Sequence, residues 1–395
     1  MKLGLIADTR HYVDAQGRVC TLTHVTRQLD CWADWFPELV ACVPVLDGPP
    51  PPTHTPYRRL RVRLKPLAQG GGNTWKAKLG LAAHCLRWWP RILETIEEVD
   101  AVHLRCPCNI GLVGLLALQG STRPRHAVYT ANWAPYPEQS WASRLQRRLL
   151  ASPRFGGPVS IYGTWPGQAA HLVTSFPPSF TMAEWRAEDE QAEARAEALA
   201  RDGSPSPVRL LAVGHLDDNK SQKTIVEAVA NLRNGGLPAT LDVIGEGPLR
   251  ERLEALRDAL GLGSAVRFHG RLSYDEVCRH YRECQFIVLS SRIESYGKVL
   301  TEGMLHGCVP LASEVGITEE ILGRGARGLT FPFGDSQALA DGVRSLAGDG
   351  ERLASMVREG RSFTMGLTIE GYRDLIEHTL RRSWPTLVPE GEVVE

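Results

Sequence analysis

The chain has 395 residues, of which 43% are hydrophobic, and its formal net charge at pH 7 is zero. This length predicts two or three domains, and the apolar content is ample for sizeable hydrophobic cores. The charge is unevenly spread, because residues 1–180 carry a net charge of +9 and the remainder carries −9. A basic N-terminal half suggests an anionic partner there, but nucleic acid is not expected because no nucleic-acid-binding motif accompanies the charge.

The chain contains nine cysteines, and their spacing is not that of a zinc site. Cys106 and Cys108 form the one close pair, and no second pair accompanies them. An odd number of cysteines without a secretory signal favours a reducing cytoplasm, in which buried thiols are structural. The opening residues 1–7 are too short for a signal peptide and predict a first strand. Apolar runs everywhere fall short of the ~20 residues that span a bilayer.

The N-terminal half alternates between strand-like and helical patterns. The predicted strands are 3–7, 39–45, 58–65, 101–104 and 127–130. The predicted helices are 21–36, 75–99 with an interruption near Pro90, 110–118, and a basic amphipathic helix that ends at Leu150. Two segments between them are predicted to be loops: the proline-rich residues 49–56, and Gly70-Gly-Gly-Asn73, which follows no buried strand and is not expected to hold phosphate.

The second half repeats this alternation after a break. Residues 183–201 predict a helix, and residues 202–207 interrupt the pattern, which places the domain boundary within 175–207. The strands predicted beyond it are 208–214, 241–245, 266–270 and 286–289, and a helix follows each. Such alternation predicts an α/β protein with a doubly wound parallel sheet in each half. The expected division is an N-terminal domain 1–180, a linker 181–207, a C-terminal domain 208–365, and residues 366–395, whose helix packs back on the N-terminal domain and precedes a tail.

One segment of the second half reads as strand, loop of small residues and helix. The strand is 286–289, and helical spacing begins after Gly297. In an open parallel sheet this loop lies at the carboxyl end of a strand, where ligands bind, and the helix N-terminus can hold a phosphate. Glu294 and Glu302 would lie about 12 Å apart in a continuous helix, so carboxylates could meet a sugar on each side of a diphosphate. The alternative is two solvated glutamates at a helix start.

Residues 290–320 resemble the E-x7-E motif of retaining glycosyltransferases of family four, which have the GT-B fold. Three shorter segments, 213–220, 245–249 and 267–270, match other landmarks of that family in the same order. The resemblance covers residues 208–345 well and the N-terminal half weakly. It implies a GT-B fold, in which two Rossmann-like doubly wound domains face each other across an interdomain cleft.

The resemblance implies that the C-terminal domain binds a UDP- or GDP-linked sugar. Glu294 would hold the hydroxyls of the sugar and Glu302 the ribose, while Lys220, Lys298 and the helix dipole at Gly297 would stabilise the leaving diphosphate. The implied donor-binding residues are Gly214, His215, Lys220, His269, Glu294, Tyr296, Gly297, Lys298, Val299 and Glu302. His215 departs from the family, which usually has an arginine there, because a neutral imidazole makes no bidentate contact with phosphate.

The resemblance assigns Arg10, Arg105, Asn132 and Trp133 to acceptor binding by the N-terminal domain. Asn132 stands where the family often has His or Asp, and an amide cannot act as a general base. The leaving diphosphate can itself accept the proton in a front-face mechanism, so Asn132 remains a catalytic candidate together with Glu294 and Lys220. Arg105 either binds phosphate or an acidic acceptor, or anchors a loop.

The resemblance, taken with these patterns, implies a cytoplasmic, retaining, hexosyltransferase-like enzyme that glycosylates a small-molecule acceptor in natural product biosynthesis. No suitable loop carries an Asp-x-Asp motif, so neither a metal nor another cofactor is expected. One alternative is a membrane-associated transferase of polysaccharide or lipid-linked sugar synthesis, with the helix of Arg144, Arg147 and Arg148 on the membrane. Another is a nucleotide-sugar-binding protein with weak catalysis. Residues 7–10 lack the glycine motif of a dinucleotide-binding oxidoreductase. The sequence does not define the oligomeric state, and a homodimer is one alternative.

Overall fold

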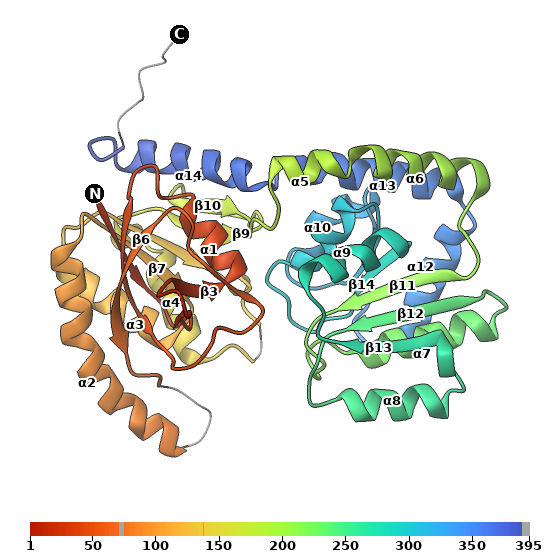
Figure 1. Ribbon diagram of the computed structural model, residues 1–395, viewed down its shortest axis with the longest axis horizontal. Helices are drawn as coiled ribbons and strands as arrows, with labels where there is room; N and C mark the ends of the chain where they lie inside the picture. Colours follow the sequence, from red (N-terminus) through yellow and green to blue (C-terminus); the bar gives the residue numbers. More distant parts are fainter. Residues whose placement is uncertain (71–74, 137, 389–395) are drawn as a thin grey trace, which may run out of the picture. The chain divides into compact units, whose positions relative to one another are not determined.

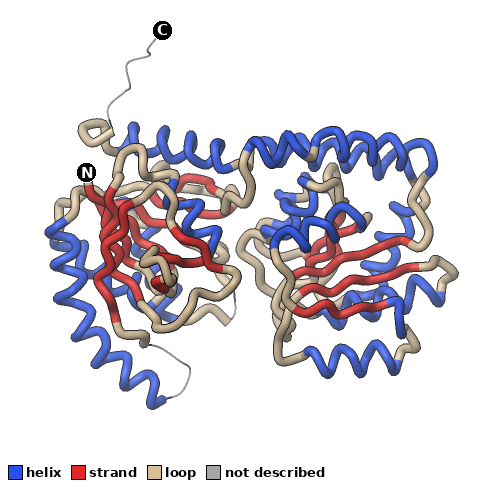
Figure 2. Tube along the Cα trace, in the orientation of Figure 1, coloured by secondary structure: helices blue, strands red, loops and turns tan. Residues whose placement is uncertain are grey.

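The computed structural model describes residues 1–70, 75–136 and 138–388. The chain divides into two compact units, which are residues 1–178 with 369–395 (unit 1) and residues 179–368 (unit 2). In each unit, a parallel sheet lies between layers of helices (Figures 1 and 2). This confirms the predicted α/β class with two doubly wound sheets, whereas most of the predicted glycine loop at 70–73 lies outside the described residues. None of the helices in the described residues has the length and apolar character of a membrane span.

The main sheet of unit 1 has seven parallel strands in the order β10-β9-β8-β7-β1-β4-β6. These strands are β1 (Lys2–Ile6), β4 (Glu38–Pro44), β6 (Arg61–Leu67), β7 (Ala101–Cys106), β8 (Arg125–Tyr129), β9 (Val159–Tyr162) and β10 (Leu172–Ser175). The strand order reverses between β1 and β7. The carboxyl ends of these two strands therefore meet at a topological switch point, where doubly wound sheets bind ligands.

Residues of the central strands in unit 1 are divided between two separate hydrophobic cores. Leu3 and Leu5 of β1 contribute to one core with α1 (Thr23–Asp30) and α14 (Ile369–Ser383), and Ile6 contributes to the other. The second core is closed by α2 (Trp75–Glu98), α3 (Asn109–Ala117) and α4 (Trp141–Ala151). Tyr372, Ile376 and Leu380 of α14 are fully buried in the first core. Burial of each such side chain contributes roughly 1.5–3 kcal/mol, which attaches the C-terminal helix to unit 1.

Two local predictions for unit 1 are wrong. The helix expected to be interrupted near Pro90 is continuous as α2, because Pro90 lies on the exposed side, where water can satisfy the carbonyl that the proline leaves unpaired. The helix expected from residue 21 begins at Thr23. The preceding residues form β3 (Val19–Leu22), which pairs with β2 (Tyr12–Val13) and with β5 (His54–Pro56) of the proline-rich segment. The β-branched side chains of β3 favour this strand.

The sheet of unit 2 has six parallel strands in the order β13-β12-β11-β14-β15-β16, the order of doubly wound nucleotide-binding sheets. The strands are β11 (Val208–Val213), β12 (Ala239–Ile244), β13 (Val266–Gly270), β14 (Phe286–Leu289), β15 (Val309–Ser313) and β16 (Leu329–Phe331). The helices that follow them are α7 (Gln222–Asn234), α8 (Arg250–Ala259), α9 (Tyr274–Glu283), α10 (Lys298–Leu305), α11 (Thr318–Ile321), α12 (Ser336–Ala347) and α13 (Gly350–Met365). Helices α7 and α8 cover one face of the sheet, and α9 and α10 cover the other (Figure 1).

The segment expected to be a linker, 181–207, is instead an integral part of unit 2. It forms α5 (Met182–Ala187) and α6 (Asp189–Asp202), and α6 packs along α13. Ala192, Ala196 and Leu199 are buried in this contact. Their spacing of four and three residues places them on one face of α6, where the two small alanines allow the helices to approach closely.

Buried histidines make the stability of unit 1 depend on pH. Burial lowers the pKa of His11 to about 4 and that of His126 to about 3. Because the unfolded chain titrates near a pKa of about 6.5, it binds protons that the native protein excludes. The free energy of unfolding contributed by these histidines is therefore fully present above about pH 6.5 and is lost progressively toward pH 4.

We predict that the His11→Gln variant takes up to one proton fewer on unfolding than the wild type. Its free energy of unfolding should therefore fall by about 3 kcal/mol less between pH 7 and pH 4. Nine of the ten tryptophans lie in unit 1, so tryptophan fluorescence in urea follows its unfolding. The unfolding midpoint of the variant should change less steeply with pH than that of the wild type. His378→Gln alters an exposed histidine and should retain the wild-type slope. Equal slopes in all three proteins would contradict the assignment.

Candidate functional site

The loop after β11, residues 214–221, is held in one conformation by its own polar groups. The side chain of Asp217 accepts a hydrogen bond from the backbone N–H of Lys220 at 2.8 Å, and Gln222 donates to the carbonyl of His215 at 2.9 Å. Ser221 has a φ of +44°, in the left-handed region that costs a residue with a β-carbon about 1–3 kcal/mol. Such strain persists only where its surroundings impose it, so the position of Lys220 is firmly defined.

The turn after β12 packs directly on this loop. A β-carbon on Gly245 would overlap the carbonyl oxygen of Gly214, and one on Gly247 would overlap that of Leu216. Backbone hydrogen bonds of 2.9 Å from Gly214 to Ile244 and of 3.0 Å from Leu216 to the carbonyl of Glu246 connect the same segments. The two glycines that carry part of the family resemblance are thus explained by close packing of two backbones.

Asn219 joins the loop after β11 to the loop after β14, residues 290–297. Its side chain accepts a hydrogen bond from the N–H of Ile293 and donates one to the carbonyl of Ile293, each at 3.1 Å. The N–H of Arg292 donates to the carbonyl of Asn219 at 2.7 Å, and the hydroxyl of Ser290 donates to the carbonyl of Lys220 at 2.7 Å. The two loops of the switch point therefore form one hydrogen-bonded frame.

Two lysine–glutamate pairs occupy this frame. Lys220 Nζ lies 2.6 Å from Glu294 Oε2, and Ser291 donates a hydrogen bond of 3.2 Å to the same oxygen. Lys298 Nζ lies 2.9 Å from Glu302 Oε1. Both lysine side chains remain partly exposed, at 26% and 38%. Each ammonium group has three donors, so an anion can bind to a lysine that also holds its carboxylate.

The N-terminus of α10 lies between the two glutamates in the sequence. Gly297 precedes it with a φ of +79°, and a β-carbon there would lie 2.9 Å from a methyl group of Leu289. Within the described residues, no side chain caps this helix. Its first N–H groups and the positive end of its dipole are therefore available to an anion such as a diphosphate.

Glu302 is only 5% exposed and is supported from behind. The hydroxyl of Tyr281 on α9 donates to Glu302 Oε2 at 3.3 Å, and burial raises the pKa of Tyr281 well above its usual value, so that the phenol keeps its proton. Tyr281 in turn stacks on His306 with the ring centroids 5.6 Å apart. The position of the second glutamate therefore depends on α9 as well as on α10.

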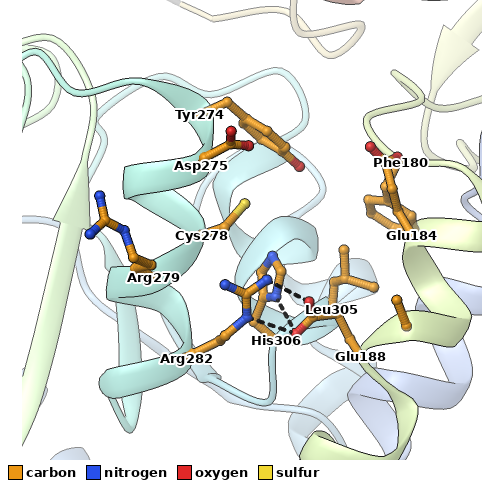
Figure 3. A pocket seen from close by; sticks show the side chains of 11 residues that line it. Phe180, Glu184, Glu188, Tyr274, Asp275, Cys278, Arg279, Arg282, Leu305 and His306 are labelled. Atoms are coloured by element: carbon orange, nitrogen blue, oxygen red, sulfur yellow. Dashed lines mark hydrogen bonds and ion pairs between the residues drawn. The ribbon is translucent and has the colours of Figure 1, made fainter.

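A cavity of about 380 Å³ lies between α5, α9 and the end of α10 in unit 2 (Figure 3). At one end Glu188 lies 2.6 Å from Arg282 and 3.0 Å from His306. Burial alone would raise the pKa of Glu188, but hydrogen bonds from these two residues lower it to about 2. Glu188 and Arg282 thus hold His306 against Tyr281, which in turn donates a hydrogen bond to Glu302.

The remaining predicted donor residues differ in their surroundings. His215 is exposed, Tyr296 is 6% exposed, and Val299 is half-buried in the first turn of α10. The ring of His269 on β13 is engaged by Asp242 of β12, with Nε2 2.6 Å from Oδ1. The structure therefore brings Lys220, Glu294, Gly297, Lys298 and Glu302 to the switch point, whereas the side chain of His269 is held by a neighbouring strand.

The predicted acceptor residues all belong to unit 1. Arg10 follows β1 and is exposed, while Arg105 of β7 is 7% exposed and donates to Gln28 at 2.5 Å. Asn132 accepts a hydrogen bond from the N–H of Ala134 at 3.1 Å within a turn. Trp133 is 9% exposed and packs in the core of unit 1. The two arginines thus follow or end the strands that meet at the switch point of this unit.

The fold and these geometries define a GT-B protein. Residues 197–363 match the family model described as glycosyl transferases group 1, so a domain of this family is found in unit 2. Over 97% of its length the chain superposes on Anabaena Alr3699/HepE in complex with UDP, with a TM-score of 0.68, 17% identity and 100% coverage of that structure. Sucrose-phosphate synthase from Thermosynechococcus elongatus gives a TM-score of 0.69 at 19% identity, covering 97% of this chain and 98% of that one.

Three sequence relatives are glycosyltransferases. Alpha-D-kanosaminyltransferase of Streptomyces kanamyceticus is 30% identical over 221 residues, which are 54% of this chain and 56% of that protein. D-inositol 3-phosphate glycosyltransferase of Corynebacterium urealyticum is 29% identical over 45% of this chain and 44% of its own. The match thus spans about half the length of these two relatives. The 2-deoxystreptamine glucosyltransferase of S. kanamyceticus is 25% identical over 79% of this chain and 82% of its own.

Sequence reasoning missed Asn219 and Tyr281, which position the site. Asn219 lies within the matched segment 213–220 but carries no predicted role, and Tyr281 lies outside the matched segments. Asn219 directly precedes Lys220 in a polar loop, and this adjacency is a signal that could have identified it. Tyr281 lies in the middle of a helical pattern and reads from the sequence as an ordinary core residue, so its contact with Glu302 depends on the packing of α9 against α10.

We predict that Asn219→Ala weakens the binding of a nucleoside diphosphate about tenfold, because two backbone groups of Ile293 lose their partners at a cost of about 1–3 kcal/mol. Isothermal titration calorimetry measures the change. Asp218→Ala alters the exposed neighbour of Asn219 and should bind as the wild type does. An Asn219 variant with unchanged affinity would show that the frame does not position the site.

Proposed function

We propose that the protein transfers a sugar from a nucleotide-diphosphate sugar, linked to UDP or GDP, to a small-molecule acceptor with retention at the anomeric carbon. The observation that carries this proposal is the arrangement at the switch point of unit 2. Two lysine–glutamate pairs, of 2.6 and 2.9 Å, accompany a helix whose N-terminus has no side-chain cap within the described residues.

The chemistry of the pairs suits the donor. Glu302 is nearly buried and held by Tyr281, so it can accept hydrogen bonds from the vicinal hydroxyls of a ribose with little loss of side-chain entropy. Glu294 lies in the loop and is 14% exposed, which leaves it accessible to the hydroxyls of the transferred sugar. The likeness to a UDP-bound structure supports the same class of donor.

The lysines suit the leaving group. As the bond between the anomeric carbon and the phosphate oxygen breaks, its electron pair passes to the diphosphate. Lys220, Lys298 and the N-terminus of α10 would stabilise this charge, and groups already in place do so without reorganisation during the reaction. His215 is exposed near Lys220 and can add a hydrogen bond, although not the bidentate contact of an arginine.

We assign acceptor binding to unit 1. One relative is named for the glucosylation of 2-deoxystreptamine, and this name supports a small polar acceptor. Arg10, Arg105 and the net charge of +9 over residues 1–180 suit an acceptor with an acidic group. Asn132 would orient the nucleophile, whose proton passes to a phosphate oxygen of the leaving group as the new bond forms on the same face of the sugar.

A membrane-bound polymer or lipid is a second candidate acceptor, favoured by the basic helix α4 and its 72% exposed Trp141. Two of the three arginines on α4 are already engaged within the chain. Arg144 donates to the carbonyl of Gln139 at 2.9 Å, and Arg147 donates to that of Trp133 at 3.1 Å. These contacts leave the charge of both arginines in place but hold the two side chains against unit 1, which limits their reach toward lipid headgroups and favours the small-molecule acceptor.

We predict that Glu302→Gln weakens the binding of UDP or GDP by about 10- to 100-fold, because a hydrogen bond to a charged group contributes about 1.5–3 kcal/mol. The melting temperature should remain near that of the wild type, because glutamine keeps the shape of the side chain. Glu251→Gln, on the surface of α8, is the matched control and should bind normally. An unchanged Kd in the Glu302 variant would reject the ribose assignment.

We also propose that sugar transfer needs no metal, because two lysines can meet the charge of the diphosphate. The rate at room temperature should therefore survive excess EDTA, whereas Lys220→Ala should lower kcat by about 100-fold or more. Lys223→Ala removes a lysine on α7 that is 64% exposed and should leave the rate unchanged. Loss of activity on chelation with recovery in Mg²⁺ or Mn²⁺ would contradict the proposal.

A further inference from the structure

A second cluster of polar side chains lies at the β12–β13 side of the sheet in unit 2. It consists of Asp242 on β12, His269 on β13 and His280 on α9. His269 Nε2 lies 2.6 Å from Asp242 Oδ1, and His280 Nδ1 lies 3.8 Å from Asp242 Oδ2. The two imidazole rings have their centroids 4.6 Å apart. One ligand atom from each residue lies within 4.8 Å of the others.

The carboxylate of this cluster is buried. Asp242 is 4% exposed in the middle of a strand whose neighbouring residues, Leu241 and Val243, are fully buried. A carboxylate in such a place is costly unless cationic or hydrogen-bonding groups surround it. Arg267 donates to Oδ1 at 3.2 Å, the same oxygen that His269 contacts. The other oxygen faces His280.

His280 supplies an independent observation. Its Nδ1 is buried and has no hydrogen-bond partner among the described residues. Buried polar nitrogen atoms without a partner are uncommon in native structures and call for an ion, a water molecule or another explanation. This nitrogen lies 3.8 Å from Oδ2 of the buried carboxylate of Asp242.

We propose that Asp242, His269 and His280 bind a divalent transition metal ion, with Zn²⁺ the best match. Two imidazoles and one carboxylate form a ligand set typical of zinc and of other first-row metals. Ligand atoms about 2.0–2.1 Å from a tetrahedral zinc ion lie about 3.3 Å from one another. The distances of 2.6 Å from His269 to Oδ1 and of 3.8 Å from His280 to Oδ2 of Asp242 bracket that value, so side-chain rotations would be needed to bring one carboxylate oxygen and both nitrogens to this spacing.

The surroundings complete the site. A cavity of about 290 Å³ opens on His269 and His280 and gives an ion a path from solvent and room for a water ligand. Glu276, Glu283 and Arg279 line the same cavity, so its carboxylates outnumber its one guanidinium group. Arg267, which is 56% exposed, would remain outside the ligand set and orient the carboxylate through its hydrogen bond.

The site is built from elements other than the loops of the donor site. Its ligands come from within β12, β13 and α9, whereas Lys220 and Glu294 follow β11 and β14. A bound ion would connect two strands to the helix that carries Tyr281. We therefore expect the metal to stabilise unit 2, and we expect no direct part for it in sugar transfer.

The test uses the full, untagged chain after treatment with EDTA and dialysis. Co²⁺ is the probe, because its visible absorption reports both binding and coordination geometry. We expect one Co²⁺ per chain, an absorption spectrum typical of nitrogen and oxygen ligands, and a rise in melting temperature with Co²⁺ or Zn²⁺, because a ligand that binds only the native state stabilises it. Mg²⁺ should have no such effect, because it prefers oxygen ligands.

His280→Ala and Asp242→Asn should each reduce the affinity for Co²⁺ at least tenfold and abolish the rise in melting temperature, while binding of UDP or GDP persists. His378→Ala, on the surface of α14, should bind Co²⁺ as the wild type does. No binding to the wild type at millimolar Co²⁺, or an equal affinity in His280→Ala, would overturn the proposal. If Asp242→Asn fails to fold, His280→Ala gives the decisive result, because His280 lies on a helix at the cavity.

Discussion

The site of unit 2 depends on the reversal of strand order between β11 and β14. This reversal places the loops after two neighbouring strands at the same edge of the sheet, although about 70 residues separate them in the chain. Asn219 then fixes one loop to the other through three hydrogen bonds to Arg292 and Ile293. Together with the hydrogen bond from Ser290 to the carbonyl of Lys220, these contacts hold Lys220 and Glu294 next to each other. Ser221, with its left-handed conformation, lies in the same frame, and its carbonyl accepts a hydrogen bond of 3.0 Å from Ser290.

Within this frame, two lysines are paired with two glutamates, and both lysines remain partly exposed to a ligand. Each lysine lies within 3 Å of a glutamate, so neither charge of a pair is left unpaired before a ligand binds. In the proposed complex, a nucleotide sugar would offer hydroxyls to the carboxylates and a diphosphate to the ammonium groups, so each charged group would gain a further partner. The uncapped start of α10 adds donors that belong to the backbone and need no side-chain ordering. The proposed chemistry thus depends on a few groups that are positioned by the sheet of unit 2.

The alternation of strands and helices could be predicted from the sequence, because hydrophobic periodicity follows directly from which faces are buried. The residues of the switch point could be predicted as well, since Lys220, Glu294, Gly297 and Glu302 follow strands in a recognisable order. Side-chain contacts between different helices or between different strands could not be predicted from the sequence. The support of Glu302 by Tyr281 depends on how α9 packs, and the buried pairing of Asp242 with His269 depends on strand register. Predictions of local structure were wrong where the surroundings of a residue outweighed its intrinsic preference. Pro90 is one example, because its exposure to solvent allows a continuous helix.

The account's central claim is that the switch point of unit 2 recognises a nucleotide-diphosphate sugar. A thermal-shift screen of UDP-, GDP-, ADP- and dTDP-linked sugars against the wild type and Lys220→Ala tests this claim most directly, because a ligand that binds only the native state raises the melting temperature. We predict that sugars of one nucleotide class raise the melting temperature of the wild type and that the variant loses most of this rise. If no class stabilises the wild type, or if the variant responds equally, the site does not bind the donor in the way described.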